Sequence, residues 1–356
     1  MNLKPYEPGK PIEEVKRELL LDEVYKLASN ENALGPSPKA ITAIKKALNG
    51  INRYPDGGCY YLKVKLARKL KVKPENLIFG NGSDEIIELI IKAFVNQDEE
   101  VIIGDPTFLE YRLISEACGS RVKAIPHLNL KYNLEEIRRA VTAKTKIIFI
   151  ANPDNPTGAY ITNNQIKRFL DGIPESVIVV MDEAYYDFID VDDYPDMLEY
   201  INDKNVLILR TFSKAHGLAG LRIGYGLGSS ELINCVNKVR QPFNVNTLAQ
   251  IAASASLDDS AHLKNTKTTI LKGKKYLYRN FDKMRLSYMP SATNFILVDV
   301  RRDGRQVFEN LLRYGVIVRD MKAYGLDNYI RVTIGIQKEN SKFIESLKKV
   351  MSSEFE

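Results

Sequence analysis

Short apolar runs alternate with longer segments of helical periodicity between about residue 77 and residue 240. The short runs are rich in β-branched residues, which is typical of buried strands, whereas the longer segments place their apolar residues on one helical face. Strands are expected at 77–79, 100–104, 121–125, 146–151, 176–183, 205–211 and 221–227, and helices from Ser83, over 107–118 and over 134–141. This alternation predicts an α/β domain in which helices cover both faces of a mostly parallel, mixed sheet.

The alternating pattern ends near Arg240. One long helical region is expected from about Thr247 to Met284, followed by strands at 293–299, 315–319 and 329–334 and helices at 304–313 and 339–351. These elements predict a smaller α+β domain. The first thirty residues are rich in proline and cannot pack alone, so they are expected to form an arm that docks elsewhere on the protein. We therefore predict an arm over 1–32, a large domain over 33–245 and a small domain over 246–356.

The composition is that of an ordinary folded protein, since 44% of the 356 residues are hydrophobic and 27% are charged. No apolar run is long enough to cross a bilayer, and the N-terminal sequence lacks the apolar stretch of a signal peptide, so we expect a cytoplasmic protein. The net charge of +6 arises from 51 Lys and Arg interleaved with 45 Asp and Glu, which argues against a nucleic-acid partner. The three cysteines and three histidines are dispersed, so we expect neither disulfides nor a metal site.

The segment 211–224, TFSKAHGLAGLRIG, carries the most informative chemistry. Lys214 follows a predicted strand, lies among small residues and is close in sequence to a second cation, Arg222. Such surroundings can lower the pKa of a lysine enough for it to attack an aldehyde. Ser213 and Arg222 supply the hydroxyl and the guanidinium that a buried phosphate monoester requires. A second anion site is expected where Gly82 and the following residues open a helix, although a plain glycine turn would read the same way.

Other polar residues follow predicted strands. Asp182 ends an apolar strand, where its carboxylate needs a partner such as a protonated pyridine nitrogen. Tyr185 could bind the phenolic oxygen of the same ring, and so could Asn155 in the rigid loop 152–158. Phe108 could stack on the face of a flat heterocycle. Each feature taken singly also has a structural explanation, such as a carboxylate that closes a turn.

Taken together, the motifs resemble the fold-type I pyridoxal-phosphate-dependent aminotransferases of classes I and II. The S-K-x-x-x-L-A-G-x-R-x-G pattern at 213–224 and the N-P-x-N-P-T-G pattern at 152–158 carry this resemblance. Within that group the chain is similar to the histidinol-phosphate aminotransferases, because of K-P-Y-x-P-G-K at 4–10. Further similar segments lie at 27–32, 53–56 and 329–335, so the resemblance covers nearly the whole chain.

The resemblance implies pyridoxal 5'-phosphate as the cofactor and assigns a role to each site residue. Lys214 would form the Schiff base, Asp182 would pair with the pyridine nitrogen, and Tyr185 and Asn155 would hold the phenolic oxygen. Phe108 would stack on the ring. The cofactor phosphate would be held by Gly82, Ser83, Asp84, Thr211, Ser213 and Arg222, with Tyr54 reaching in from the second subunit of a homodimer. The arm would then contribute to both the small domain and the dimer contact.

The resemblance also implies the reaction, a transamination between L-histidinol phosphate and 2-oxoglutarate that yields imidazole acetol phosphate and L-glutamate in L-histidine biosynthesis. Arg319 and Arg331 would clamp the anionic end of the substrate, with Asn32 and with Tyr6 of the other subunit. Surface ion pairing is the simpler explanation for either arginine alone. An aromatic amino-acid aminotransferase, a phosphothreonine-type decarboxylase and a cofactor-binding regulator remain as alternatives.

Overall fold

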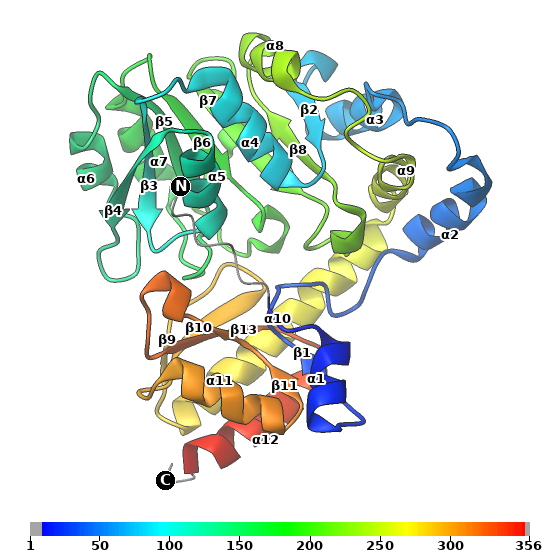
Figure 1. Ribbon diagram of the computed structural model, residues 1–356, viewed down its shortest axis with the longest axis vertical. Coiled ribbons are helices and arrows are strands. Elements are labelled where there is room, and N and C mark those ends of the chain that lie inside the picture. The colour runs from blue at the N-terminus through cyan, green and yellow to red at the C-terminus, as the bar shows by residue number, and fades with distance from the viewer. Residues whose placement is uncertain (1–8, 353–356) are drawn as a thin grey trace.

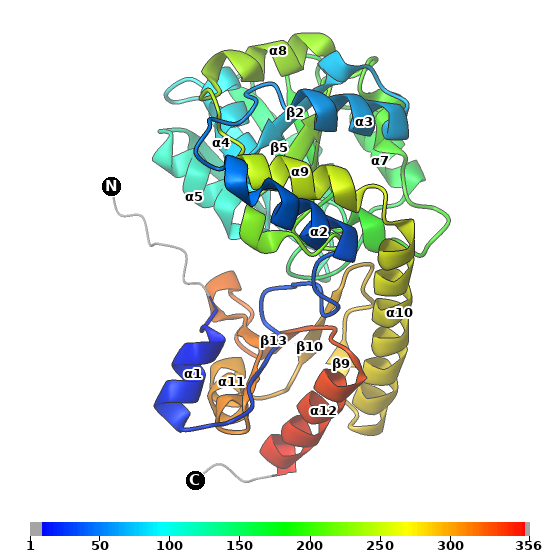
Figure 2. The same cartoon turned by 90° about the vertical axis from the view of Figure 1, so that its right-hand side faces the viewer.

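The computed structural model describes residues 9–352 and has two lobes joined by a long helix (Figure 1). We call the part built on the seven-stranded sheet the large lobe and the part built on the four-stranded sheet the small lobe. The helix α10 (Ser260–Lys283) runs from one lobe along the side of the other, as the view in Figure 2 shows. No helix among the described residues is long and apolar enough to cross a membrane.

The sheet of the large lobe has the strand order β2-β8-β7-β6-β5-β3-β4. Five neighbouring strands are parallel, whereas β8 runs antiparallel to both of its neighbours. The strands are β2 (Leu77–Gly80), β3 (Glu100–Asp105), β4 (Arg121–Pro126), β5 (Thr145–Ala151), β6 (Ile178–Asp182), β7 (Val206–Thr211) and β8 (Gly224–Leu227). The predicted fold class, a mixed and mostly parallel sheet between helices, is confirmed.

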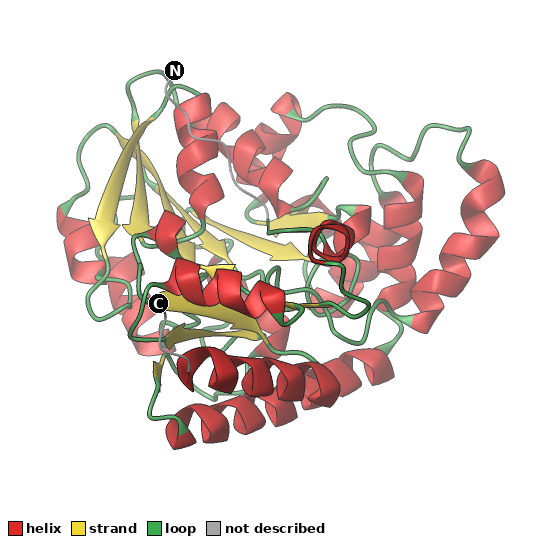
Figure 3. Ribbon diagram, turned by 60° about the horizontal axis from the view of Figure 1, so that its bottom comes forward, coloured by secondary structure: helices red, strands yellow, loops and turns green. Residues whose placement is uncertain are grey.

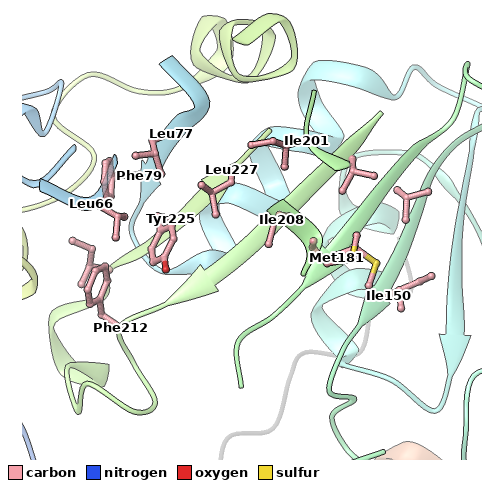
Figure 4. Close-up of a cluster of buried hydrophobic side chains, with 14 of the residues drawn as sticks. Leu66, Leu77, Phe79, Ile150, Met181, Ile201, Ile208, Phe212, Tyr225 and Leu227 are labelled. Atoms are coloured by element: carbon pink, nitrogen blue, oxygen red, sulfur yellow. The ribbon is translucent and has the colours of Figure 1, made fainter. Parts of the chain in front are cut away.

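Helices cover both faces of this sheet (Figure 3). Along β5, Ile148 and Ile150 face one core while Ile147 and Phe149 face the other, as the two-residue period of a strand requires. The first core, part of which is drawn in Figure 4, packs against α3 (Tyr60–Leu70), α6 (Leu134–Arg139), α7 (Asn163–Asp171) and α9 (Thr247–Ser256). The second packs against α4 (Ser83–Phe94), α5 (Leu109–Ala117) and α8 (Ser230–Val239). Because helices bury both faces, the strands are almost continuously apolar.

The small lobe contains the antiparallel sheet β12-β13-β10-β9 and a two-stranded parallel sheet of β1 and β11. Its strands are β1 (Tyr25–Lys26), β9 (Ser287–Tyr288), β10 (Phe295–Asp299), β11 (Val316–Ile317), β12 (Arg319–Asp320) and β13 (Tyr329–Thr333). Its helices, besides most of α10, are α1 (Ile12–Leu19), α11 (Gly304–Arg313) and α12 (Gln337–Ser352). The described part of the arm therefore completes this lobe, while α2 (Pro38–Ala47) packs on α9 of the large lobe.

Several sequence-based boundaries were wrong; the strand expected over 221–227, for example, begins only at Gly224, after a short 3₁₀ helix at Ala219–Leu221. The helix expected over 107–118 begins only at Leu109, because the loop that follows β3 extends through Phe108. The helical region 247–284 is divided into α9 and α10 by a turn at Leu257–Asp259, where Asp259 caps the second helix. The strand expected over 315–319 is split between two sheets: β11 pairs with β1, and β12 pairs with β13. Periodicity identifies extended segments but not their partners.

Candidate active site

A cavity opens at the carboxyl ends of β5, β6 and β7, where the two lobes meet. Ala151, Asp182 and Thr211 end these strands and line it. Its wall is completed by the strap Ser29–Asn30, the start of α4 and Arg331 of β13. The site is thus placed where open α/β sheets hold ligands. Of the predicted site residues, the cavity is lined by Ser83, Asp84, Phe108, Asn155, Asp182, Tyr185, Thr211, Ser213, Lys214, Arg222 and Arg331.

Lys214 lies in a tight turn directly after β7. The amide of Gly217 donates to the Lys214 carbonyl at 3.0 Å, and the amide of Ser213 donates to Oγ1 of Thr211 at 3.1 Å. The side chain reaches the cavity, where Nζ donates to the carbonyl oxygen of Ser29 at 3.2 Å and lies 5.8 Å from the ring centre of Tyr185. The turn therefore fixes the base of the lysine while its amine faces the strap and the cavity.

One end of the cavity gathers donors for an anion. Arg222 adopts a left-handed backbone conformation, and its guanidinium donates to Oγ of Ser213 at 3.4 Å and to Asp84 at 2.8 Å. Ser83 begins α4, so its backbone N–H belongs to the free N–H groups of that helix start. Gly82 has φ +85°, and a Cβ there would lie 2.4 Å from Nη2 of Arg222. Glycine is therefore required for the arginine to approach the helix start.

Asp182 is buried at the end of β6, where burial raises the pKa of its carboxyl to about 6. Two donors partly oppose this rise: the hydroxyl of Tyr111 donates to Oδ2 at 2.6 Å, and the amide of Ala184 donates to Oδ1 at 3.0 Å. Tyr111 is held in place by parallel stacking on Phe149, with ring centres 4.8 Å apart. A cationic nitrogen beside Asp182 would favour the charged carboxylate.

Tyr185 and Asn155 line the cavity near Lys214, and each is held by an amide or guanidinium from elsewhere in the fold. Nδ2 of Asn30 donates to the Tyr185 hydroxyl at 2.8 Å. Nη1 of Arg331 donates to Oδ1 of Asn155, which leaves the amide nitrogen of Asn155 as the donor end of that side chain. Phe108 directly precedes α5 and lines the cavity, and its ring is edge-on to Tyr111 with ring centres 5.5 Å apart.

Among the described residues, four that were predicted for the site do not line the cavity of this single chain. Tyr54 is 84% exposed and stacks on Phe243. Asn32 donates to the Ala215 carbonyl at 2.8 Å and to Thr266 at 3.1 Å, so its amide serves the packing of the strap. Arg319 is buried on β12, directly opposite Arg331 in the sheet register, but does not line the cavity. Tyr6 lies outside the described residues. Gly82 acts through Arg222 rather than by lining the wall.

Comparison with known proteins places this geometry in a family. The family model described as aminotransferase class I and II matches residues 22–347. The chain belongs to this family. Among curated class I and II aminotransferases, the histidinol-phosphate aminotransferase of Moorella thermoacetica is 48% identical over 99% of this chain and 92% of its own length. That of Caldicellulosiruptor saccharolyticus is 45% identical over 98% of both chains.

Solved structures of aminotransferases agree with the fold. The histidinol-phosphate aminotransferase from Sinorhizobium meliloti, in complex with pyridoxal-5'-phosphate, superposes with a TM-score of 0.91 at 29% identity and covers 97% of this chain and 95% of its own. That from Clostridium acetobutylicum gives a TM-score of 0.85 at 26% identity, with coverage of 92% and 99%. An aspartate aminotransferase from Thermus thermophilus, at 21% identity, shares the fold with a TM-score of 0.84.

The aminotransferase cavity fits pyridoxal phosphate on three observations of this chain. The donors around Arg222, and the glycine that admits them, suit its phosphate. The buried carboxyl of Asp182 suits its ring nitrogen, and the two donors Tyr185 and Asn155 suit its phenolic oxygen. Among residues 9–352, no cluster of three His, Cys, Asp or Glu side chains could hold a metal ion. The residues therefore match the organic cofactor group by group.

Sequence reasoning missed several residues that hold this aminotransferase site together. Tyr111 follows Phe108 by one helical turn, and this spacing could have suggested that it faces the same cavity. A buried ion pair, which no local pattern signalled, joins Arg210 and Glu183 at 2.8 Å. The hydroxyl of Tyr194 donates to Glu183 at 3.2 Å and also to the carbonyl of Asn152. The pair thereby fixes the loop that carries Asn155.

Proposed function

We propose that the protein transfers an amino group from L-histidinol phosphate to 2-oxoglutarate, giving imidazole acetol phosphate and L-glutamate in L-histidine biosynthesis. The observation that carries the proposal is the position of Arg331, buried in the cavity wall on the same side as Asn155. Its Nε has no hydrogen-bond partner among the described residues, although a buried donor normally has one. Because Arg331 lines the cavity, an anionic group of the substrate would bind its guanidinium there. Curated relatives at 42–48% identity over nearly the whole chain carry the same activity in their names.

Each site residue has a task in this reaction. Pyridoxal phosphate, when bound, supplies an aldehyde that receives the amino group and a ring that withdraws electrons from the reacting carbon. Asp182 would keep the ring nitrogen protonated, and Tyr185 and Asn155 would donate to the phenolic oxygen. Ser213, Arg222, Thr211 and the start of α4 would hold the phosphate, and Phe108 would pack on the ring face. Lys214 Nζ takes the proton from the substrate carbon that bears the amine.

Arg331 orients the substrate in the same scheme. Its guanidinium is already held by Asn155 and by the carbonyl of Ala28, at 2.8 Å for the latter, so it has a fixed geometry at the cavity wall. The phosphate of histidinol phosphate and a carboxylate of glutamate or 2-oxoglutarate would occupy this position in turn. Arg319, Asn32 and Tyr6 of a second subunit stay as proposed contributors to the same anion site.

We also propose that the protein is a cytoplasmic homodimer with shared active sites. Support comes from exposed apolar side chains of the segment 51–61 and from Phe243, on which Tyr54 stacks, while Tyr60 contacts Tyr61. We call this set the aromatic patch: Ile51, Tyr54, Tyr60, Tyr61 and Phe243. Patches of this kind mark association surfaces. A second copy of this chain is the proposed occupant, with Tyr54 reaching its cofactor phosphate. The proposed domains are 33–245 and 246–356, with the arm over 1–32 packed on the small domain and at the dimer contact.

The test of the function is spectroscopic. The absorption band of the lysine-bound cofactor is followed in the loaded enzyme on addition of histidinol phosphate, and in parallel with histidinol, tyrosine and glutamate. Histidinol is the matched control because it lacks only the phosphate. Loss of the band at low concentrations of histidinol phosphate, but not of histidinol, is expected. A response to tyrosine alone would move the protein to the aromatic aminotransferases, and the absence of any such band would overturn the cofactor assignment.

A further inference from the structure

A chain of hydrogen bonds behind Tyr185 connects the two lobes. Besides Tyr185, its member Asn30 lines the cavity, whereas Thr333 does not. The backbone N–H of Asn30 donates to Oγ1 of Thr333 at 3.0 Å. The Thr333 hydroxyl donates to Oδ1 of Asn30 at 3.1 Å, and Nδ2 of Asn30 donates to the Tyr185 hydroxyl at 2.8 Å. The participants come from the strap, from β13 of the small lobe and from the loop after β6 of the large lobe.

The direction of these bonds is set at one end. A backbone N–H can only donate, so Oγ1 of Thr333 must accept from Asn30 and has its own proton left to give. That proton goes to Oδ1 of Asn30, which fixes the carbonyl end of the amide toward Thr333 and the NH₂ end toward Tyr185. Because the Tyr185 oxygen accepts from Asn30, the phenol proton must point in another direction. Tyr185 lines the cavity, and in the proposed function its hydroxyl donates to the phenolic oxygen of the cofactor.

Burial makes the direction of this chain costly to reverse. Asn30 is 1% exposed and Thr333 4%, so a flipped amide would leave polar atoms unpaired away from water. Asn30 also has φ +57°, a conformation that asparagine tolerates better than most residues, and its carbonyl accepts from Nδ2 of Asn294 at 3.0 Å. The asparagine is therefore held in place by its backbone as well as by its amide.

We propose that Asn30 and Thr333 are positioning residues that lock Tyr185 as a hydrogen-bond donor toward the phenolic oxygen of the cofactor. This inference rests on the proposed function, because it concerns the oxygen that Tyr185 is proposed to hold. Asn155 is fixed in the same sense by Arg331, so both residues would donate to that oxygen and neither would accept from it. Such a pair favours the anionic form of the oxygen. Losing one donor therefore shifts the titration of the bound cofactor to higher pH.

The experiment measures the pH midpoint of the visible absorption change of the cofactor-loaded enzyme, without substrate, in matched variants. Tyr185→Phe is the reference that removes the donor itself. Thr333→Val keeps the shape of Thr333 but removes its hydroxyl, and Thr333→Ser keeps the hydroxyl. Thr145→Val makes the same change at a buried threonine that begins β5, far from the cavity. Thermal unfolding of the cofactor-free proteins shows the cost in stability separately from the spectrum.

Thr333→Val is expected to raise the midpoint by about half a pH unit or more, in the direction of Tyr185→Phe, whereas Thr333→Ser and Thr145→Val leave it in place. In a Tyr185→Phe background, Thr333→Val should add nothing further, because the two residues act on one donor. An unchanged midpoint in Thr333→Val, or an equal rise in the Tyr185→Phe background, would overturn the inference alone. An unchanged midpoint in Tyr185→Phe would instead remove the role of Tyr185 in the proposed function.

Discussion

The guanidinium of Arg331 donates to Oδ1 of Asn155 across the boundary between the small and the large lobe. One residue is proposed to hold the substrate anion and the other the cofactor, so the two binding tasks share a hydrogen bond. Arg331→Lys cannot serve Asn155 and a bidentate anion together. We expect KM for histidinol phosphate and for 2-oxoglutarate to rise about 10- to 100-fold in steady-state kinetics. The control is Arg305→Lys, at an exposed arginine paired with Glu309, and normal KM values in Arg331→Lys would contradict the assignment.

Lys214 is the proposed Schiff-base lysine and general base, so Lys214→Ala should keep the fold but lose turnover. We expect kcat to fall at least about 1,000-fold, the scale of a lost proton-transfer group. A matched variant is available at the half-buried Lys123 of the edge strand β4, which donates to the carbonyl of Ala140. Lys123→Ala should turn over normally in the same assay. Comparable rates in the two variants would mean that another group moves the proton.

The carboxyl of Asp182 gives a pH dependence with a defined sign. Burial raises its pKa from 3.8 to about 6, so between these values the folded protein binds more protons than the unfolded chain. This group therefore lowers the free energy of unfolding as pH rises through that window. Cofactor-free Asp182→Asn should gain stability relative to wild type across it, by up to about 3 kcal/mol in urea denaturation. If the free energies of unfolding of wild type and Asp182→Asn change with pH in parallel, Asp182 does not titrate with a raised pKa.

Tyr111→Phe tests the same carboxyl from the other side. The hydrogen bond from Tyr111 lowers the pKa of Asp182, so its loss should raise that pKa. The pH window in which the cofactor-free protein loses stability then extends to higher pH. The measurement compares the free energy of unfolding of cofactor-free Tyr111→Phe with that of Tyr111→Phe/Asp182→Asn over the same pH series. If the window does not move, the hydroxyl contributes only to packing.

The buried pair of Arg210 and Glu183 should be sensitive to loss of one member. Glu183→Gln leaves a buried guanidinium without its counter-charge, which costs about 3–5 kcal/mol of unfolding free energy. The double variant Glu183→Gln/Arg210→Met should be less destabilised than the sum of the single variants. On the surface, Glu135→Gln at the exposed pair with Arg138 provides the control and should change stability by less than about 1 kcal/mol. Equal costs at the two pairs, measured in urea, would disprove the argument.

The aromatic patch predicts a change in oligomeric state. Tyr61 is 82% exposed and Ile51 63% exposed, so Tyr61→Asp and Ile51→Asp should leave the fold intact while placing a charge in the proposed dimer contact. We expect half the wild-type molar mass in light scattering and weaker retention of the cofactor, because Tyr54 of the second subunit would be lost. Leu128→Asp alters a similarly exposed apolar residue outside the patch and should keep the wild-type mass. A wild-type protein that is already monomeric would refute the proposal directly.

Much of this fold could be predicted because its signals are local. Lys214, Asp182 and Asn155 come at the ends of apolar runs, which indicates that their side chains lie at strand ends. Parallel strands bring such ends together. The direction of β8 could not be predicted, since an apolar run reads the same in a parallel and an antiparallel position. The strand expected over 315–319 divided between two sheets for a related reason, because each half found its partner elsewhere in the chain.

The supporting polar contacts could not be predicted, because their partners are distant in sequence. Asn30 meets Tyr185 over 155 positions and Thr333 over 303. Asn30 lies in the segment 27–32, which carries a family resemblance but no other signal, and that resemblance assigns its neighbour Asn32 to the substrate. The side chain of Asn32 donates to the Ala215 carbonyl. The packing of both lobes around the strap decides which of these two asparagine side chains faces the cavity. A local sequence pattern cannot predict this packing.

The pairing of β1 with β11 also has a consequence for folding during synthesis on the ribosome. Tyr25 pairs with Val316, so a growing chain must add 316 − 25 = 291 residues before the first strand can meet its partner. At the rates of ribosomal synthesis this takes roughly 15 to 60 s. The seven-stranded sheet is complete in sequence long before then, at Leu227. The β1–β11 pairing next to the strap therefore cannot form until well after the sheet is complete in sequence, and a nascent chain can carry a finished sheet while its catalytic centre is still unassembled.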